Sequence, residues 1–176
     1  MTQDDYSPFT RMFMERLRTL AAGGKAQLKR NAGKPLAEAR DSLALFYRLL
    51  PSGVHPAQEE WYFLVATLYP LADEGQAGNL GDSLRRAAGD NNRKGVDRRV
   101  EILLDADASQ LPFHLRQSIR FLKSNDVSVN WPRLLEDVLQ WNHPRHYVQK
   151  QWARSYFADP AQANKEMAAE AAGQAQ

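Results

Sequence analysis

The stretch LPFHLRQSIRFLK, residues 111–123, decides the fold class of this chain. Its apolar residues recur every three or four positions, so on a helix they share one side: Leu111, Leu115, Ile119 and Leu122. Pro112 lies at the start of this stretch, where a proline destabilises a helix least, because the first N–H groups of a helix have no partner within the helix. The stretch therefore predicts an amphipathic helix that buries one face in a core.

The same helical spacing runs through most of the chain. Ser7-Pro8 is typical of a helix start, and Gly23-Gly24 is expected to end that first helix. Further helices are predicted around residues 26–31, 36–50, 56–69 and 83–88, and at the apolar stripes that begin near Val96, Trp131 and Val148. No run of residues alternates with a period of two, so no sheet is expected. The chain is predicted to be all-α, with roughly eight or nine helices.

A chain of 176 residues suits one domain or two small lobes. The glycines and polar residues between Leu80 and Gly95 suggest a break between lobes in that region. We predict an N-terminal helical lobe over residues 7–88 and a C-terminal helical lobe over residues 96–158. Residues 159–176 carry no large apolar stripe, and we expect them to form a disordered tail.

Composition excludes several classes of protein. The chain has no cysteine, so it has no disulfide framework, thiol nucleophile or cysteine-zinc site. With a mean hydropathy of −0.58 and no long apolar run, no membrane span is expected. The acidic start of the chain lacks the basic and apolar parts of a signal peptide. The expected location is the cytoplasm.

Charge is segregated along the chain although its formal sum is only +2. Residues 11–34 hold seven basic side chains and one acid, and residues 85–99 hold six basic side chains and two acids. Residues 50–82, by contrast, hold five acids and no lysine or arginine. Two interpretations stay open: the charges simply solvate the outer sides of helices, or a basic face binds an anionic partner.

Rows of like charge favour the second interpretation. On the helix of residues 111–123, Arg116, Arg120 and Lys123 lie opposite the apolar side, and no acid shares that row. Lys150 and Arg154 form a similar pair on the last helix. Like charges four residues apart cost a few tenths of a kcal/mol in an isolated helix, so their retention favours an anionic partner. Long cationic side chains also cover apolar edges, which leaves a structural role open.

Two arginines are placed less simply by their helical angle. Arg16 falls among the apolar residues of the first helix, where a buried or interfacial ion pair is expected. Arg99 lies at the edge of an apolar stripe, where its stem can pack against the stripe and its guanidinium can extend outward. The alternative is that an acid holds the Arg99 side chain, namely Glu101, Asp105 or Asp107.

No enzyme signature is present. Gly75, Gly78 and Gly81 fit neither a phosphate loop nor a dinucleotide motif. His143 and His146 lack further metal ligands, and we interpret them as a turn residue and a helix-start residue. Asp105 and Asp107, two residues apart, do not face each other on a helix and make a weak two-metal site. We predict no catalytic residue, cofactor or metal.

Several segments, in order along residues 10–158, carry a resemblance to a known family: Gly24-Lys-Ala-Gln-Leu-Lys-Arg30; Leu45-Phe-Tyr-Arg-Leu-Leu-Pro51; Leu80-Gly81 with Leu84-Arg85; Asp97-Arg-Arg99 with Leu103-Leu104-Asp-Ala-Asp107; Leu111-Pro-Phe-His-Leu-Arg116; Trp131-Pro-Arg-Leu-Leu135 with Trp141; and Val148-Gln-Lys-Gln-Trp-Ala-Arg154 with Tyr156-Phe157. Together they resemble the CasB family, the small subunit of the type I-E CRISPR surveillance complex, Cascade. The resemblance implies a small two-lobed helical fold and a non-catalytic subunit.

In that family, two copies of the small subunit lie along backbone subunits, a large subunit and CRISPR RNA. They help to hold the R-loop, largely by binding the displaced strand of the target DNA through basic side chains. The resemblance thus implies nucleic acid, other Cascade subunits and a second copy as partners, with no membrane and no small-molecule substrate. The basic positions that match the family here are Arg30, Arg85, Arg99, Arg116, Arg145 and Arg154.

Neighbouring cations complete the predicted nucleic-acid-binding set: Lys29, Arg86, Arg98, Arg120, Lys123 and Lys150. The chain departs from some relatives at Pro56-Ala-Gln58, where they carry an arginine, and in the acids that follow Arg99. Trp61, Trp131, Trp141 and Trp152 mostly lie on apolar stripes, so we expect electrostatic binding rather than base stacking. Two alternatives stay open, a helical adaptor that binds only protein and a divergent nuclease that uses Asp105 and Asp107.

Overall fold

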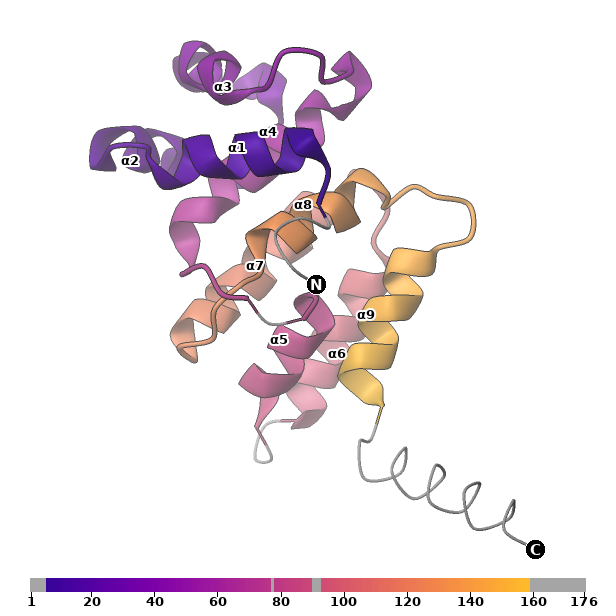
Figure 1. Cartoon of the computed structure of the whole chain (residues 1–176). Coiled ribbons are helices and arrows are strands. Elements are labelled where there is room, and N and C mark those ends of the chain that lie inside the picture. Colours follow the sequence, from indigo (N-terminus) through magenta and orange to yellow (C-terminus); the bar gives the residue numbers. More distant parts are fainter. Residues whose placement is uncertain (1–5, 77, 90–92, 159–176) are drawn as a thin grey trace, which may run out of the picture.

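Helices make up most of this computed structural model, which describes residues 6–76, 78–89 and 93–158 (Figure 1). The α-helices in these ranges are α1 (Pro8–Arg18), α2 (Ala22–Arg30), α3 (Leu43–Leu49), α4 (Glu59–Leu68), α5 (Leu80–Ala88), α6 (Arg93–Asp105), α7 (Leu111–Ser124), α8 (Trp131–Leu139) and α9 (Tyr147–Phe157). Short 3₁₀ turns join some of them, and the only β pairing in the described ranges is an isolated bridge between Glu74 and Val129. The all-α prediction is confirmed.

Helix starts follow the expected local chemistry. The Ser7 hydroxyl accepts the N–H of Thr10 at 3.1 Å and so caps α1. Asn79 and Asp82 exchange side-chain and backbone hydrogen bonds at the start of α5. These contacts satisfy N–H groups that have no partner within the helix.

Two sequence-based predictions about the N-terminal region are wrong. Gly23-Gly24 does not end a helix but lies in the first turn of α2, because α1 already ends at Arg18. Residues 36–50 do not form one helix: two 3₁₀ turns come first, and only Leu43–Leu49 is α-helical. The backbone leaves helical geometry at Ala39, which has φ −101° and ψ 48°. The Glu60 carboxylate accepts the N–H of Leu36 at 3.0 Å and so joins the first turn to α4.

The helices are arranged in three tiers. In Figure 1, α1 to α4 lie at the top, α5, α6 and α9 at the bottom, and α7 and α8 between them. α5 packs on α9 and also contacts α6 and α7. The division into lobes 7–88 and 96–158 stays a prediction, and the packing of α5 favours a boundary before Leu80. The predicted tail, residues 159–176, lies outside the described residues.

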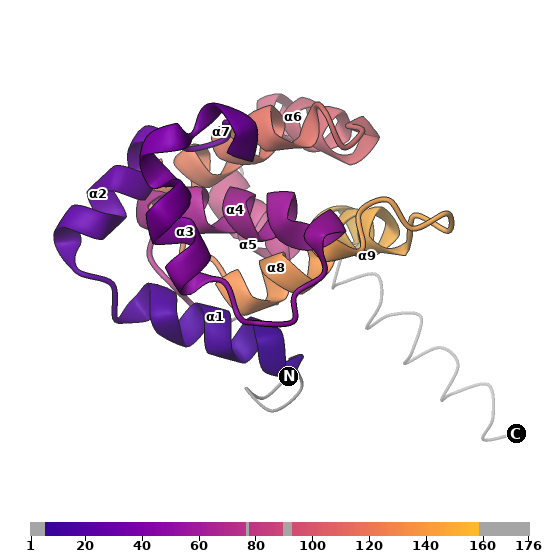
Figure 2. The same ribbon diagram turned by 90° about the horizontal axis from the view of Figure 1, so that it is seen from above.

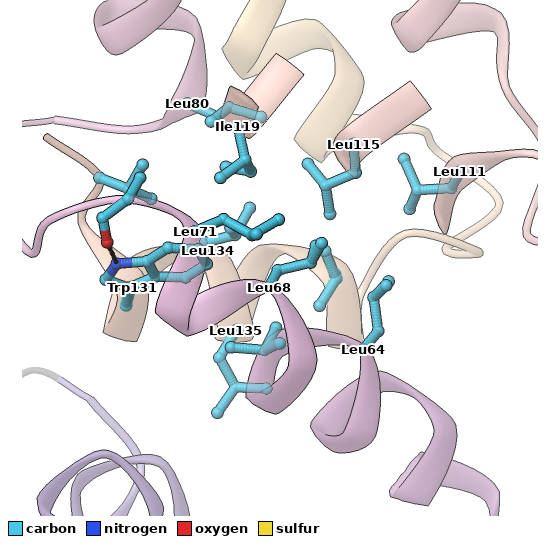
Figure 3. Close-up of a cluster of buried hydrophobic side chains, with 14 of the residues drawn as sticks. Leu64, Leu68, Leu71, Leu80, Leu111, Leu115, Ile119, Trp131, Leu134 and Leu135 are labelled. Carbon is cyan, nitrogen blue, oxygen red and sulfur yellow. Dashed lines mark hydrogen bonds between the residues drawn. The ribbon is translucent and has the colours of Figure 1, made fainter. Parts of the chain in front are cut away.

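A single hydrophobic core joins these tiers. Figure 3 shows its middle, where leucines of α4 meet residues of α7 and α8: Leu64, Leu68, Leu111, Leu115, Ile119, Leu134 and Leu135. Trp131 closes one end of the cluster, and its indole N–H donates to the Ala72 carbonyl at 3.3 Å. The apolar side predicted for residues 111–122 is therefore the buried side of α7. No helix within the described ranges has the length and apolarity needed to cross a bilayer.

A buried carboxylate links α8 to α9. Asp137 accepts the indole N–H of Trp152 at 2.7 Å and the Nε–H of Arg133 at 2.8 Å. Burial raises the pKa of Asp137, although both partners favour its ionised form. The three side chains hold α9 against the central tier, which sets where its outer cations lie.

Candidate nucleic-acid interface

The predicted cations fall into two groups according to their helices. The α7 group comprises the cations of α2, α6 and α7: Lys29, Arg30, Arg98, Arg99, Arg116, Arg120 and Lys123. The α9 group comprises those on α5, on α9 and just before α9: Arg85, Arg86, Arg145, Lys150 and Arg154. Figures 1 and 2 place α2 and α9 at opposite sides of the molecule, so the twelve positions do not form one cluster.

Within the α7 group, α2 and α7 share a hollow of about 460 Å³. Lys29 and Lys123 line it together with Lys25, which sequence analysis missed although it stands four residues before Lys29. The Lys123 ammonium lies 2.7 Å from the Asp73 carboxylate, which also raises the Lys123 pKa. The row of cations on α7 contains no acid, but Asp73, in a loop fifty residues earlier in the chain, supplies an acidic partner for Lys123.

Arg116 has a structural role as well as a charge. Its side chain is half-buried and passes so close to Gly33 that a Cβ there would lie 3.3 Å from the Arg116 Cδ. Its Nε is buried and has no hydrogen-bond partner among the residues described. Arg120, one turn further along α7, is exposed and forms no ion pair with any described side chain. Arg120 is therefore the freer of the two to meet an anion.

Arg99 is held by an aromatic ring rather than by an acid. Its guanidinium lies 5.0 Å from the centre of the Phe121 ring, and its Nη1 donates to the Gln117 carbonyl at 3.4 Å. The nearby acid Glu101 instead pairs with Arg98 at 3.7 Å. The alternative in which Glu101, Asp105 or Asp107 holds Arg99 is therefore not seen in the described part of the chain. Arg99 keeps its charge available while its position is restrained.

Of the two acids considered as a nuclease site, Asp107 has local hydrogen-bond partners. The Asp107 carboxylate accepts N–H groups of Ser109 and Gln110, at 2.8 and 3.0 Å, and the Ser109 hydroxyl, and these bonds lower its pKa. Asp105 is the exposed last residue of α6. Over residues 6–76, 78–89 and 93–158, no cluster of three metal-ligating side chains occurs.

Within the α9 group, the cations of α9 lie on the far side of the molecule from α2. Lys150 and Arg154 are exposed, opposite the buried side of α9 that carries Val148, Trp152 and Tyr156.

Arg145 is exposed, and its N–H donates to the His143 ring at 3.2 Å in the turn before α9. His146 is the N-cap of α9, so the turn and helix-start roles predicted for these two histidines are confirmed. On α5, Arg85 is half-buried, and Arg86 donates to the Ser83 hydroxyl at 3.2 Å.

Arg30 and Arg16 both contact residues near α3. Arg30, at the end of α2, is exposed and lies 4.0 Å from the Asp41 carboxylate. Arg16 donates to the carbonyls of Leu49 and Leu50 at 3.1 and 3.0 Å. The prediction of an ion pair for Arg16 is wrong for the described chain. The guanidinium instead donates to the backbone carbonyls at the end of α3. A cation at a helix C-terminus stabilises that end of the helix.

The four tryptophans are not exposed stacking groups, but another aromatic side chain is exposed. Trp131, Trp141 and Trp152 are buried and Trp61 is partly buried, as predicted. Phe113 on α7, however, is 59% exposed. The signal was present in the sequence, since Phe113 lies outside the apolar side defined by the leucines of this helix.

Comparison with known proteins relates the chain to one family. Residues 24–157 match the family described as CRISPR-associated protein Cse2. A curated relative, CRISPR-associated protein Cse2 of Thermus thermophilus, is 35% identical over 102 residues. That alignment covers 57% of this chain and 57% of the relative.

Solved structures share the fold. A CRISPR-associated protein of the Cse2 family from Thermus thermophilus is 29% identical with a TM-score of 0.75, covering 87% of this chain and 99% of the other. M. ruber CasB is 26% identical with a TM-score of 0.72, and the match covers 89% of this chain and 96% of M. ruber CasB. A chain of a CRISPR RNA-guided surveillance complex is 20% identical with a TM-score of 0.75. The match covers 90% of this chain and 97% of the other, and at this identity it shows a shared fold alone.

Proposed function

This chain belongs to the CRISPR-associated Cse2 family, and we propose that it is the non-catalytic small subunit of a type I-E CRISPR RNA-guided surveillance complex, Cascade. Its partners in that complex are the CRISPR RNA, the target DNA, the backbone and large subunits and a second copy of itself. Support comes from the family match and from Cascade chains with the same fold.

Within the complex, we propose that the chain binds the sugar-phosphate backbone of the displaced DNA strand and so stabilises the R-loop. Guide RNA reads the target by base pairing, so a protein subunit needs only sequence-independent contacts. R-loop formation is a nearly balanced exchange of one duplex for another, and a few phosphate contacts shift it. Basic side chains on α6 and α7 suit that task.

The observation that carries this proposal is that Arg99 and Arg120 have no acidic partner within the described ranges. Both are exposed, and neither forms an ion pair with a described residue. An exposed arginine without an acid partner keeps its full charge for an anion, whereas Lys123 is already paired with Asp73. Cations left without a counter-charge on neighbouring helices favour an anionic ligand.

Binding of single-stranded DNA, measured by fluorescence anisotropy at several salt concentrations, tests the proposal. If the protein neutralises about four phosphates, the logarithm of affinity should fall against the logarithm of salt with a slope of about −3. Strands of different sequence should bind alike. No binding, or binding without salt dependence, would favour the adaptor that contacts only protein. Cleavage of the strand in Mg²⁺ would favour the nuclease that uses Asp105 and Asp107.

A further inference from the structure

The most exposed large apolar side chain in the described residues is that of Phe113, on the third residue of α7. Its ring meets the His114 ring edge to face, with centres 5.3 Å apart. In this edge-to-face contact the two rings share little surface, and most of the Phe113 side chain stays exposed to water. An exposed phenylalanine loses the free energy that burial would provide, so a ligand that covers the ring recovers it.

Phe113 borders a hollow between α6 and α7, which lie side by side (Figure 2). The hollow has a volume of about 390 Å³, within the range of small-ligand sites. Ile102 of α6 and His114 of α7 line it beside Phe113, and Ile102 is itself 39% exposed. Exposed apolar and aromatic side chains thus form part of the lining, next to polar groups.

The charged residues that line this hollow are two arginines. Arg98 is paired with Glu101, which lies outside the lining, so among the described residues Arg99 supplies the unmatched positive charge. Acids appear only in the adjoining hollow on the other side of Ile102, where Glu101 and Asp105 lie. An anionic group is thus favoured at the Arg99 end and disfavoured at the end where α6 finishes.

Arg99 is positioned in advance for such a contact. The Phe121 ring and the Gln117 carbonyl restrain its guanidinium, so little side-chain entropy is lost when it binds. A planar apolar surface next to a restrained arginine suits one class of ligand well: an unpaired nucleobase with its phosphate. Aromatic rings stack on any base, and arginine binds the phosphate oxygens.

We propose that the hollow between α6 and α7 holds one unpaired nucleobase, stacked on Phe113, with an adjacent phosphate on Arg99. This inference rests on the proposed function, and it adds a stacking position to a surface otherwise described by charge. The acids beyond Ile102 direct the phosphate backbone toward the start of α6. A protein partner is the competing occupant, and the experiment below separates the two.

The test is a double-mutant cycle on the full chain. Wild-type protein and Phe113→Ala are titrated with a thymidine strand and with a strand of equal length made of abasic sites. Phe113→Ala should weaken binding to the thymidine strand about 5- to 150-fold, the range measured for one stacked base. It should change binding to the abasic strand little, because no base is there to stack. Phe113→Trp should bind the thymidine strand at least as well as wild type.

Phe9→Ala is the matched control, since Phe9 on α1 is also exposed, at 41%, and lies beside Gly53 on another face. It should leave both titrations unchanged, and thermal melting should show that all variants fold. Equal weakening of Phe113→Ala on both strands would overturn the stacking proposal, as would no weakening on either. In the second case, loss of assembly with Cascade subunits would assign the hollow to protein. Salt-independent or absent binding by wild type would overturn the proposed function itself.

Discussion

The close approach of α5 to α9 predicts that Gly81→Ala destabilises the protein. Gly81 is the second residue of α5, and a Cβ built on it would overlap the carbonyl oxygen of Trp152 in α9 and lie 3.0 Å from the carbonyl carbon. Ordinary contacts of a Cβ begin at 3.4 Å, so α5 must move by about 1 Å to admit the methyl group. Backbone atoms cannot turn aside as a side-chain end can, and the strain spreads into the α5–α9 packing.

The magnitude follows from two opposing effects. Overpacking a well-packed site costs about 1–3 kcal/mol, and a backbone clash belongs at the upper end. Alanine recovers up to about 1 kcal/mol over glycine through its helix propensity, which leaves a net loss of about 2 kcal/mol. For a chain of this size that loss lowers Tm by about 4–8 °C. Thermal and urea unfolding, followed by circular dichroism, measure it.

The chain offers a control with the same chemical change and the opposite sign. Gly23 lies in α2, and a Cβ there would meet nothing within 4 Å. Gly23→Ala should therefore stabilise the protein by about 0.4–1 kcal/mol through the entropy of the unfolded chain. If Gly81→Ala melts at or above the wild-type temperature while Gly23→Ala behaves as expected, α5 and α9 do not approach as closely as described.

Two further outcomes are expected. Arg99→Glu together with Arg120→Glu should lower the R-loop yield of the assembled complex for every target sequence. If each arginine binds one phosphate, the slope of log affinity for single-stranded DNA against log salt should fall by about 1.4 in magnitude. Loss of the Arg99–Phe121 contact should cost about 0.5–1 kcal/mol and lower Tm by about 1–4 °C; a larger fall in Tm with normal R-loop yield would contradict the assignment. Burial and Glu74 raise the pKa of Tyr69 to about 12, so the folded state keeps a proton that the unfolded chain loses near pH 10. Stability should consequently fall as the pH rises from about 10 to 12, and urea unfolding of Tyr69→Phe over that range should show a shallower fall; an unchanged slope would refute the assignment.

Family membership and the helical class could be predicted from the sequence, because both depend on local pattern. The spacing of Leu111, Leu115, Ile119 and Leu122 is enough to identify the buried side of α7, since a helix turns by a constant angle per residue. The same rule places Lys150 and Arg154 outside. It also predicts one helix over residues 36–50, where the structure has two 3₁₀ turns before α3, and Asn31 and Glu60 form hydrogen bonds to these turns.

Which cations remain free was decided only by the tertiary structure. Lys123 and Asp73 are fifty residues apart, and no helical rule relates them, yet the fold places their charges 2.7 Å from each other. Packing of α6 on α7 likewise sets Arg99 on the Phe121 ring and opens the hollow beside Phe113. Helical periodicity specifies the direction of a side chain from its own axis, whereas its partners depend on how separate helices meet when they bury a common core.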